Sequence, residues 1–401
     1  MKNNISVLPK HECCGCRACG DICPRKCISF AADEEGFCYP SIDESACNDC
    51  GLCSKVCSSL HPHLSSEHPV ATYVAYALDR EKHRAGSSGG LFGIIAAYVI
   101  EHGGKVCGAA FDSNLKLHHC SAANMQELGP LLKSKYIQSD TTGVYKAIKQ
   151  DLHNGITTLF VGTPCQCNAL KNYIGGNDEN LIVVDLVCHG VPSQDMFDKS
   201  IRWFEQKHNC SVTGFTFRYK EKRNRSSQIY KIDYSARDEV KSKVGIYYDF
   251  PHFYGFSTYK TLRLSCYQCK WAKPFRCGDL TIADFWGIES LRPHLDSKDG
   301  VSLLLANNDA GTALIEKIKY HLHIEEAPFD YACKNNGCLQ GPTQLKESRT
   351  ALFSDLQNMN FDEVVKKHLS PRRKLLFDIY YNIPSGVKRI IRAMAGNRLK
   401  L

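Results

Sequence analysis

The stretch CCGCRACGDICP, residues 13–24, decides what the N-terminal part of the chain folds around. Its cysteines are spaced C-x2-C-x2-C-x3-C and a proline follows; they are Cys13, Cys16, Cys19 and Cys23. The same spacing returns, without the proline, at Cys47, Cys50, Cys53 and Cys57. In runs of this kind three closely spaced thiolates bind one iron–sulfur cube, and the fourth reaches across to the other cube. The doubled run therefore predicts two [4Fe–4S] clusters.

The crossing rule assigns each cysteine of the two runs to a cluster. One cluster takes the first thiol set, Cys13, Cys16, Cys19 and Cys57, and the other takes the second thiol set, Cys47, Cys50, Cys53 and Cys23. Bacterial-type ferredoxins have this arrangement, which predicts that the protein moves electrons. Cys14, Cys27 and Cys38 fall outside the runs and are interpreted as small buried hydrophobic side chains.

Two other uses of these cysteines have to be weighed. Four-thiolate zinc sites also use C-x2-C pairs, but they have no use for a third cysteine two residues further on. A disulfide framework would need an oxidising compartment, and the first residues, MKNNISVLPKHE, lack the apolar segment of a secretory signal. Twenty-two cysteines without such a signal predict a cytoplasmic protein whose thiols serve metals or redox chemistry.

Length and charge set further limits. A chain of 401 residues predicts two or three domains, and its longest apolar stretch, residues 91–100, is too short to cross a membrane. The formal charge of +8 is concentrated in residues 371–401, which gives no support to a nucleic-acid partner. In that tail Val387, Ile390, Ile391 and Met394 share one helical face. This face predicts either a helix packed on the body or peripheral contact with a membrane.

The order of elements predicts a fold that is part α+β and part α/β. A small ferredoxin-like 2[4Fe–4S] domain, residues 1–62, is followed by a polar linker and an α/β flavin and iron–sulfur domain with a mixed sheet, residues 70–345. Within it, strands at 72–78, 105–111, 157–161 and 181–187 alternate with helices at 91–101, 141–153, from about 163, and 194–207, so mostly parallel strands are expected. Residues 211–255 are interpreted as an antiparallel insertion or sheet extension, and 346–401 as a basic helical tail.

Later cysteines predict a third cluster. Cys165 lies where a strand passes into a helix, and Cys188 lies at the end of the next buried strand. Carboxyl ends of neighbouring strands line one crevice, so these two thiols are expected to face one site. With Cys266 and Cys269 they make the four pocket thiols, and Cys277 is a reserve ligand. The alternatives are a catalytic Cys165, a core Cys188, and zinc at Cys266, Cys269 and Cys277. The remaining cysteines, Cys338 among them, have no recognisable spacing and are interpreted as structural.

A flavin site is the other prediction, although no G-x-G-x-x-G or Walker loop occurs. Residues 86–90, GSSGG, open a helix whose N–H groups suit a phosphate, and the segment KSKYIQS adds charge and donors. The alternative is an ordinary helix N-cap followed by a polar strand end. The candidate contacts are Ser87, Ser88, Gly89, Gly90, Lys135, Tyr136, Gln138 and Ser139.

Five segments in this order resemble the coenzyme F420 hydrogenase/dehydrogenase β-subunit family. They are GSSGGLFGIIAAYVIEHGGKVCGAAFD, LLKSKYIQSD, LFVGTPCQCNAL, LIVVDLVCHGVPS and CYQCKWAKPFRCGDLTIADFWGIE. The resemblance implies noncovalent FAD beside an iron–sulfur cluster. It carries cluster ligands onto Cys165, Cys188, Cys266 and Cys269, and flavin contacts onto Ser88, Gly89, Gly90, Lys135, Tyr136 and Ser139. Members differ in substrate, so the family name does not identify one.

These observations predict a reductase. Electrons would pass from an external low-potential donor, such as ferredoxin or a reduced (deaza)flavin, through the clusters to FAD and a small-molecule hydride acceptor. His189 and Asp284 are candidate proton donors, His189 being equally a candidate hydrogen-bond partner of cluster or flavin, and Asp284 a candidate loop support. Two rivals are an electron-transfer subunit that serves a partner protein and an interaction module with structural metals. Whether the chain forms a homo-oligomer is left open.

Overall fold

The computed structural model describes residues 3–65, 67–220, 228–237, 239–296 and 298–383. The chain divides into two compact units, which are described here one at a time. Unit 1 consists of residues 1–196 and 262–345, and unit 2 of residues 197–261 and 346–401. Residues 1–62 thus share a unit with the body that follows them. The predicted face of Val387, Ile390, Ile391 and Met394 lies outside the described residues.

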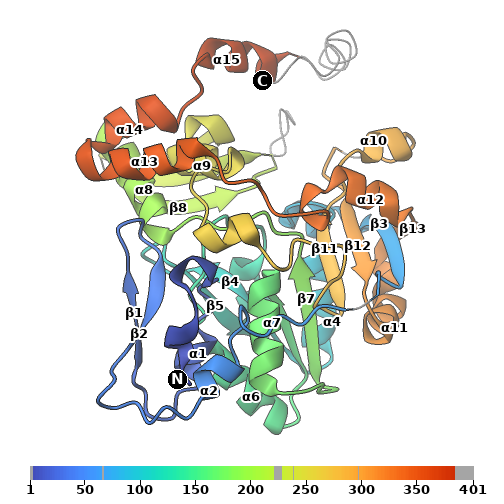
Figure 1. The fold of residues 1–401 in the computed structure, drawn as a ribbon. Coiled ribbons are helices and arrows are strands. Elements are labelled where there is room, and N and C mark those ends of the chain that lie inside the picture. Colours follow the sequence, from blue (N-terminus) through green and yellow to red (C-terminus); the bar gives the residue numbers. More distant parts are fainter. Residues whose placement is uncertain (1–2, 66, 221–227, 238, 297, 384–401) are drawn as a thin grey trace. The chain divides into compact units, whose positions relative to one another are not determined.

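An eight-stranded sheet forms the centre of unit 1, in the order β13-β3-β12-β11-β7-β6-β4-β5 (Figure 1). Its strands are β3 (Ala71–Ala77), β4 (Lys105–Phe111), β5 (Leu117–Ala122), β6 (Thr158–Gly162), β7 (Leu181–Leu186), β11 (Leu280–Asp284), β12 (Ser302–Ala306) and β13 (Leu322–Glu326). The expected mixed sheet is confirmed. The expectation of mostly parallel strands is wrong, because only β4–β6, β6–β7 and β7–β11 pair in parallel and the other four pairs are antiparallel.

Both faces of this sheet are buried, because successive side chains of the central strands pack into cores on opposite sides. Leu159 and Val184 pack into a core with α4 (Leu91–Glu101) and α11 (Asp309–Ile318). Their neighbours Phe160 and Val183 point the other way, into a core with α6 (Val144–His153) and α7 (Pro164–Ile174). Successive side chains of a strand face opposite sides, so a run such as LIVVDL is apolar throughout when both sides are covered.

The N-terminal segment packs beside α6 and α7. It holds η1 (Ile5–Val7), η2 (Lys10–Glu12), α1 (Ala18–Asp21), α2 (Leu52–Lys55) and an antiparallel hairpin of β1 (Ile28–Ala32) and β2 (Cys38–Ile42). The two cysteine runs repeat one backbone shape, because α1 and α2 each follow a residue in the left-handed region, Arg17 at φ 60° and Gly51 at φ 77°. Thr141 donates to the Cys16 carbonyl at 2.7 Å, and Asp21 accepts from the Gly143 amide at 2.7 Å. Side-chain bonds thus tie the first run to the loop before α6.

Shorter elements complete unit 1. They are α3 (Arg80–Ala85), α5 (Met125–Leu128), η3 (Gly129–Leu131), η5 (Leu264–Gln268), α10 (Ile288–Leu291), η6 (Lys319–His321), α12 (Phe329–Asn335) and η7 (Gly337–Leu339). Leu303 and Leu305 of β12 pack with Ala332 of α12, which extends the buried layer across that end of the sheet.

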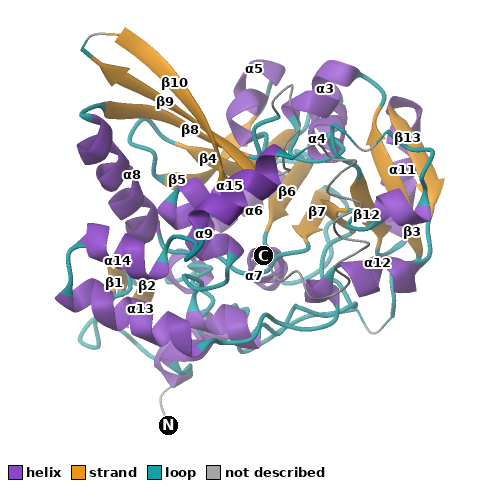
Figure 2. Ribbon diagram, turned by 90° about the horizontal axis from the view of Figure 1, so that it is seen from above, coloured by secondary structure: helices purple, strands orange, loops and turns teal. Residues whose placement is uncertain are grey.

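Unit 2 is built on a separate three-stranded antiparallel sheet, in the order β10-β9-β8 (Figure 2). The strands are β8 (Ser211–Phe217), β9 (Ile229–Ala236) and β10 (Glu239–Ile246), preceded by α8 (Gln194–His208) and followed by η4 (Tyr247–Asp249), α9 (Pro251–Ser257), α13 (Glu347–Asn358), α14 (Phe361–His368) and α15 (Lys374–Asn382). The predicted antiparallel insertion is confirmed. Phe197, Phe215 and Phe250 pack edge to face or tilted in its core. None of the helices among the described residues combines the length and apolarity needed to cross a membrane.

Candidate metal centre

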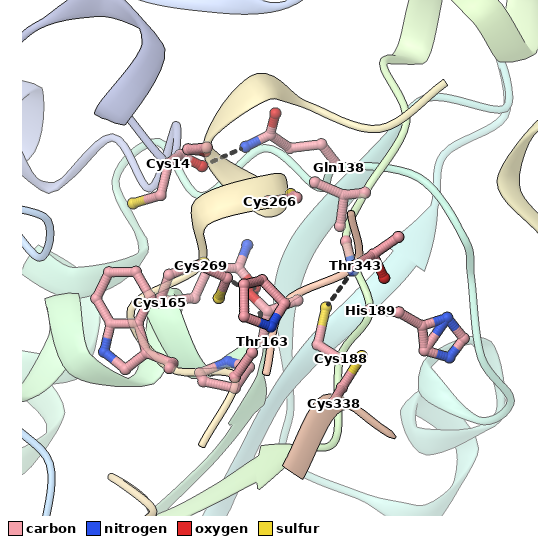
Figure 3. A pocket seen from close by; sticks show the side chains of 18 of the residues that line it. Cys14, Gln138, Thr163, Cys165, Cys188, His189, Cys266, Cys269, Cys338 and Thr343 are labelled. Carbon is pink, nitrogen blue, oxygen red and sulfur yellow. Dashed lines mark hydrogen bonds between the residues drawn. The ribbon is translucent and has the colours of Figure 1, made fainter. Parts of the chain in front are cut away.

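A cavity of about 50 Å³, here called the central pocket, lies where β6 and β7 end (Figure 3). Its walls come from six separate stretches of unit 1: residue 14 and residues 137–139, 163–166, 188–191, 265–272 and 338–343. Six cysteines line it, namely Cys14, Cys165, Cys188, Cys266, Cys269 and Cys338. The fold therefore brings all four predicted pocket thiols to one cavity, together with two cysteines that spacing does not single out.

Cys165 occupies the first turn of α7. Thr163 is the N-cap residue of this helix, and Gln166 Oε1 accepts from its backbone N–H at 3.0 Å and from its hydroxyl at 2.9 Å. The hydroxyl also lies 3.2 Å from the Cys165 sulfur. The field at a helix N-terminus favours a thiolate. Interaction with the Cys14 thiol, and burial, nevertheless raise the pKa of Cys165 well above its usual value. A bound cation is what would hold this sulfur as a thiolate.

Cys188 and Cys266 line the pocket from two different parts of the chain. Cys188 follows β7 and accepts from the Gly190 amide at 3.3 Å. A side chain on Gly190 would meet Cys266, so glycine allows these two walls to come close. Burial raises the pKa of Cys188, and it raises the pKa of Cys266 to about 12. Ligation by a metal would offset the cost of burying these sulfurs as thiolates.

A buried ion pair fixes the loop that carries Cys269. Arg276 Nη2 lies 2.7 Å from Asp185 Oδ1, with the two side chains 1% and 0% exposed. Arg276 also donates to the carbonyls of Leu186 and Trp271, at 2.9 and 3.2 Å. Because Asp185 belongs to β7, the pair joins the strand that leads to Cys188 to the loop that follows Cys269. The sequence gives no signal for this pairing.

Cys277 belongs to that buried network and does not line the central pocket. Its amide and thiol lie 3.2 and 3.4 Å from Asp185 Oδ2, and the thiol also donates to the Pro164 carbonyl at 3.3 Å. The reserve ligand is therefore outside the pocket lining, with its sulfur bonded to protein oxygen atoms.

The second thiol set gathers around a pocket of its own in the N-terminal segment. Cys23 of the first run lines it with Cys47, Cys50 and Cys53 of the second run, as the crossing rule predicts. Cys27 joins them, its sulfur 3.4 Å from that of Cys23. The backbone amide of Ile5 donates to the Cys53 sulfur at 3.3 Å. Four thiols from two distant runs thus surround one space.

The thiols of the first set act on one another electrostatically. Burial, and then the charges of Cys13 and Cys57, raise the pKa of Cys19 well above its usual value. Interaction with the Cys14 thiol, then burial, and then the charges of Cys57 and Cys19 raise the pKa of Cys16 well above its usual value. Among the described residues, no three His, Cys, Asp or Glu side chains converge as a single metal ion would require. A cube of four irons and four sulfides is wider than one ion, so its ligands stand further apart.

The residues proposed for flavin divide into three groups. Gln138 and Ser139 line the central pocket. Ser88 donates to the Val301 carbonyl at 2.9 Å, and the Gly89 amide donates to Ser302 Oγ at 2.8 Å. A side chain on Gly89 would strike the Ala75 carbonyl, so close packing explains this glycine. Gly90 is left-handed, at φ 80°, as the residue before α4.

The remaining flavin candidates bridge these groups. Ser87 accepts from the Ser134 amide at 2.6 Å, which joins the loop before α4 to the segment containing Lys135 and Tyr136. Lys135 Nζ donates to the carbonyls of Pro130 and Leu132, at 2.7 and 2.8 Å, and burial lowers the pKa of Lys135 to about 7. The candidate residues are contiguous, but several of their polar groups are bonded within the protein. This does not fit a phosphate cradle already formed.

The two candidate proton donors lie in different positions. His189 lines the central pocket, and burial lowers its pKa while the charge of Asp284 acts in the opposite direction. Asp284 ends β11 opposite Ser302 and does not line the pocket. The geometry thus gives only His189 direct access to the cavity.

Comparison with known proteins adds a family. Residues 157–331 match the family model for the C-terminal part of the coenzyme F420 hydrogenase/dehydrogenase β subunit, and this range contains all four pocket thiols. A chain of the F420-reducing [NiFe] hydrogenase complex from Methanosarcina barkeri aligns with 71% of this chain and 98% of its own length, at 14% identity and a TM-score of 0.44. No curated protein matches the chain.

Proposed function

We propose that the chain is an iron–sulfur oxidoreductase, starting from the match of residues 157–331 to the family model of the coenzyme F420 hydrogenase/dehydrogenase β subunit. The first and second thiol sets, in residues 1–62, each bind a [4Fe–4S] cluster, and the four pocket thiols bind a third in the body formed by residues 70–345. The observation that carries this proposal is the central pocket, where the four pocket thiols, from three distant segments, line one cavity. Electrons enter from an external low-potential donor and pass through the clusters.

Removing single pocket thiols tests this assignment. The anaerobically purified chain is expected to hold about twelve irons, four per cluster. Cys188→Ala and Cys266→Ala are each expected to lose about four of them, while Cys277→Ala keeps the full number because its sulfur does not reach the pocket. The paramagnetic signals of the other two clusters, read by electron paramagnetic resonance (EPR), report whether each variant has folded. Loss of iron from Cys277→Ala, with full retention in the other two, would contradict the ligand set.

FAD is the acceptor that we propose next to the third cluster. When bound, it accepts single electrons and delivers a hydride equivalent to a substrate. The segments containing Ser87 and Lys135 meet at Ser134, and the second of them continues to Gln138 at the pocket, which supports a site along this edge. Binding requires Lys135 and Ser88 to exchange their internal bonds for bonds to the cofactor. His189, at the pocket wall, is the candidate to hold or donate a proton. Asp284 supports the loop that follows it in the chain.

An electron-transfer subunit without a substrate of its own is the second candidate. The internal bonds of Ser88, Gly89 and Lys135 favour it, because they leave those groups committed to the protein. The partner would then be another protein. The two candidates separate when the chain is reduced anaerobically, freed of reductant and mixed with small two-electron acceptors. Reoxidation by a small molecule, with one FAD per chain, supports the enzyme; reoxidation only by a partner protein supports the relay.

A further inference from the structure

Arg263 is a buried cation whose partners are not carboxylates. Its side chain is completely buried. Nε donates to the Cys13 carbonyl at 2.6 Å, Nη1 to Gln138 Oε1 at 2.9 Å, and Nη2 to the Cys38 carbonyl at 2.9 Å. Within the described part of the chain no carboxylate forms an ion pair with it. The other buried arginine of this region, Arg276, does form an ion pair with a carboxylate, that of Asp185.

A buried guanidinium needs a nearby negative charge, because burying an unpaired ion costs free energy of folding. Proposed sulfur ligands lie next to Arg263 on two sides: Nη2 lies 3.7 Å from the Cys13 sulfur, and the Cys266 amide donates to the Arg263 carbonyl at 2.9 Å. Cys13 belongs to the first thiol set and Cys266 to the pocket thiols. Arg263 therefore lies between the two proposed cluster sites, with its guanidinium also against the Tyr39 ring at 4.2 Å.

The backbone of residues 13–16, to which Arg263 donates, leaves room for the Arg263 side chain. Gly15 has φ 71°, and a side chain there would collide with Gln138 Nε2 and Arg263 Nη1. Gln138 Nε2 in turn donates to the Cys14 carbonyl at 2.8 Å. The left-handed glycine thus lets two side chains from the body hold residues 13–16 by their backbone.

Cys14 lies between the first thiol set and the central pocket. It lines the central pocket, and it belongs to one buried cluster with Cys16, against which Cys165 packs. It is buried, and it lies outside the ligand sets assigned by spacing. One small sulfur therefore fills the space between a proposed ligand of the first cluster and a proposed ligand of the third.

We propose that Cys14 and Arg263 form the crossing for electrons between the first thiol set and the central pocket, and that Arg263 raises the potential of the first cluster. The inference rests on the proposed function. At the crossing one electron leaves the reduced first cluster and arrives at the pocket cluster, and no bond or proton changes place. A reduced cluster carries one more negative charge than an oxidised one, so a buried cation next to it favours reduction.

Potentiometric titration followed by EPR tests the role of the charge. In Arg263→Gln the reduction equilibrium of one cluster is expected to shift at least about tenfold toward the oxidised form, about 59 mV for one electron. Arg263→Lys keeps the charge and is expected to restore most of the difference. Arg17→Gln is the matched control. Arg17 lies in the first cysteine run, next to Cys16, but it is paired with Asp140 at 2.8 Å. Equal potentials in Arg263→Gln and wild type would overturn the role of the charge.

Rapid reduction tests the crossing itself. The full chain is mixed with reduced methyl viologen, a one-electron donor, and the pocket cluster is followed by freeze-quench EPR. Cys14→Ala is expected to slow its reduction several-fold with the iron content unchanged. Cys38→Ala, in the same module but lining neither pocket, is expected to match wild type. An unaltered rate in Cys14→Ala would overturn the crossing, whereas a wild-type chain without clusters would overturn the proposed function instead.

Discussion

At the scale of single residues, the buried carboxylate of Asp185 joins two walls of the central pocket. Its carboxylate accepts from Arg276 and from Thr281 Oγ1 at 2.7 Å each, and from the Gly278 amide at 2.9 Å. All of these donors are buried. The strand before Cys188 and the loop after Cys269 are therefore held by one side chain, so the spacing of the pocket thiols depends on it.

Asp185→Asn is expected to destabilise the protein by about 3–5 kcal/mol, because it leaves the Arg276 charge buried without its partner. The measurement is the midpoint of urea unfolding under anaerobic conditions, compared with wild type. Asp151→Asn is the matched control, since it breaks the partly exposed pair with Lys105 at 2.6 Å and should cost about 1 kcal/mol or less. Equal losses in the two variants would show that the buried pair does not anchor the fold.

At this scale the sequence predicted the cysteines whose spacing or position at strand ends is typical of cluster ligands. The crossing of Cys23 to the second run and the meeting of Cys165 and Cys188 at strand ends both follow from local patterns. Arg263 and Cys338 carry no such signal, because only the folded chain brings them to Cys13 and to the pocket. For flavin, the sequence offered suitable residue types but no information that Ser88 and Lys135 are already bonded within the protein.

At the scale of elements, the strands and helices from residue 72 to 207 lie within a few residues of their predicted bounds. The apolar runs and the glycines that interrupt them are strong local signals. Pairing was less predictable: β3, which opens the α/β series, lies between β12 and β13 and is antiparallel to both. Such pairing joins segments more than two hundred residues apart, and periodicity alone does not encode it.

Gly278 sets the approach of β11 to β7, and replacing it tests that packing. A side chain at Gly278 would lie 2.8 Å from the Leu280 carbonyl oxygen, 2.9 Å from the Asp185 nitrogen and 3.0 Å from the Val183 oxygen, all backbone atoms. Gly278→Ala is expected to cost about 1–3 kcal/mol in urea unfolding. Gly337→Ala, at the start of η7 and with open space around it, is expected to gain about 0.4–1 kcal/mol. A neutral Gly278→Ala would contradict the close approach.

At the scale of the whole molecule, the site is a product of long-range folding. The walls of the central pocket come from residue 14, from the ends of β6 and β7, and from segments near residues 266 and 340. The sequence predicted which chemistry these parts share, since cysteine spacing and a family resemblance both indicate iron–sulfur clusters. It did not predict that the N-terminal module shares a compact unit with the body, or that Cys14 lines the pocket.

The central claim is that twelve thiolates hold three cubane clusters in one chain. The most direct test is the iron, acid-labile sulfide and flavin content of the full chain purified without oxygen. We expect about twelve irons and twelve sulfides per chain, with one FAD if the chain is the enzyme. Colourless protein that contains zinc, or no metal and no sulfide, would contradict the account.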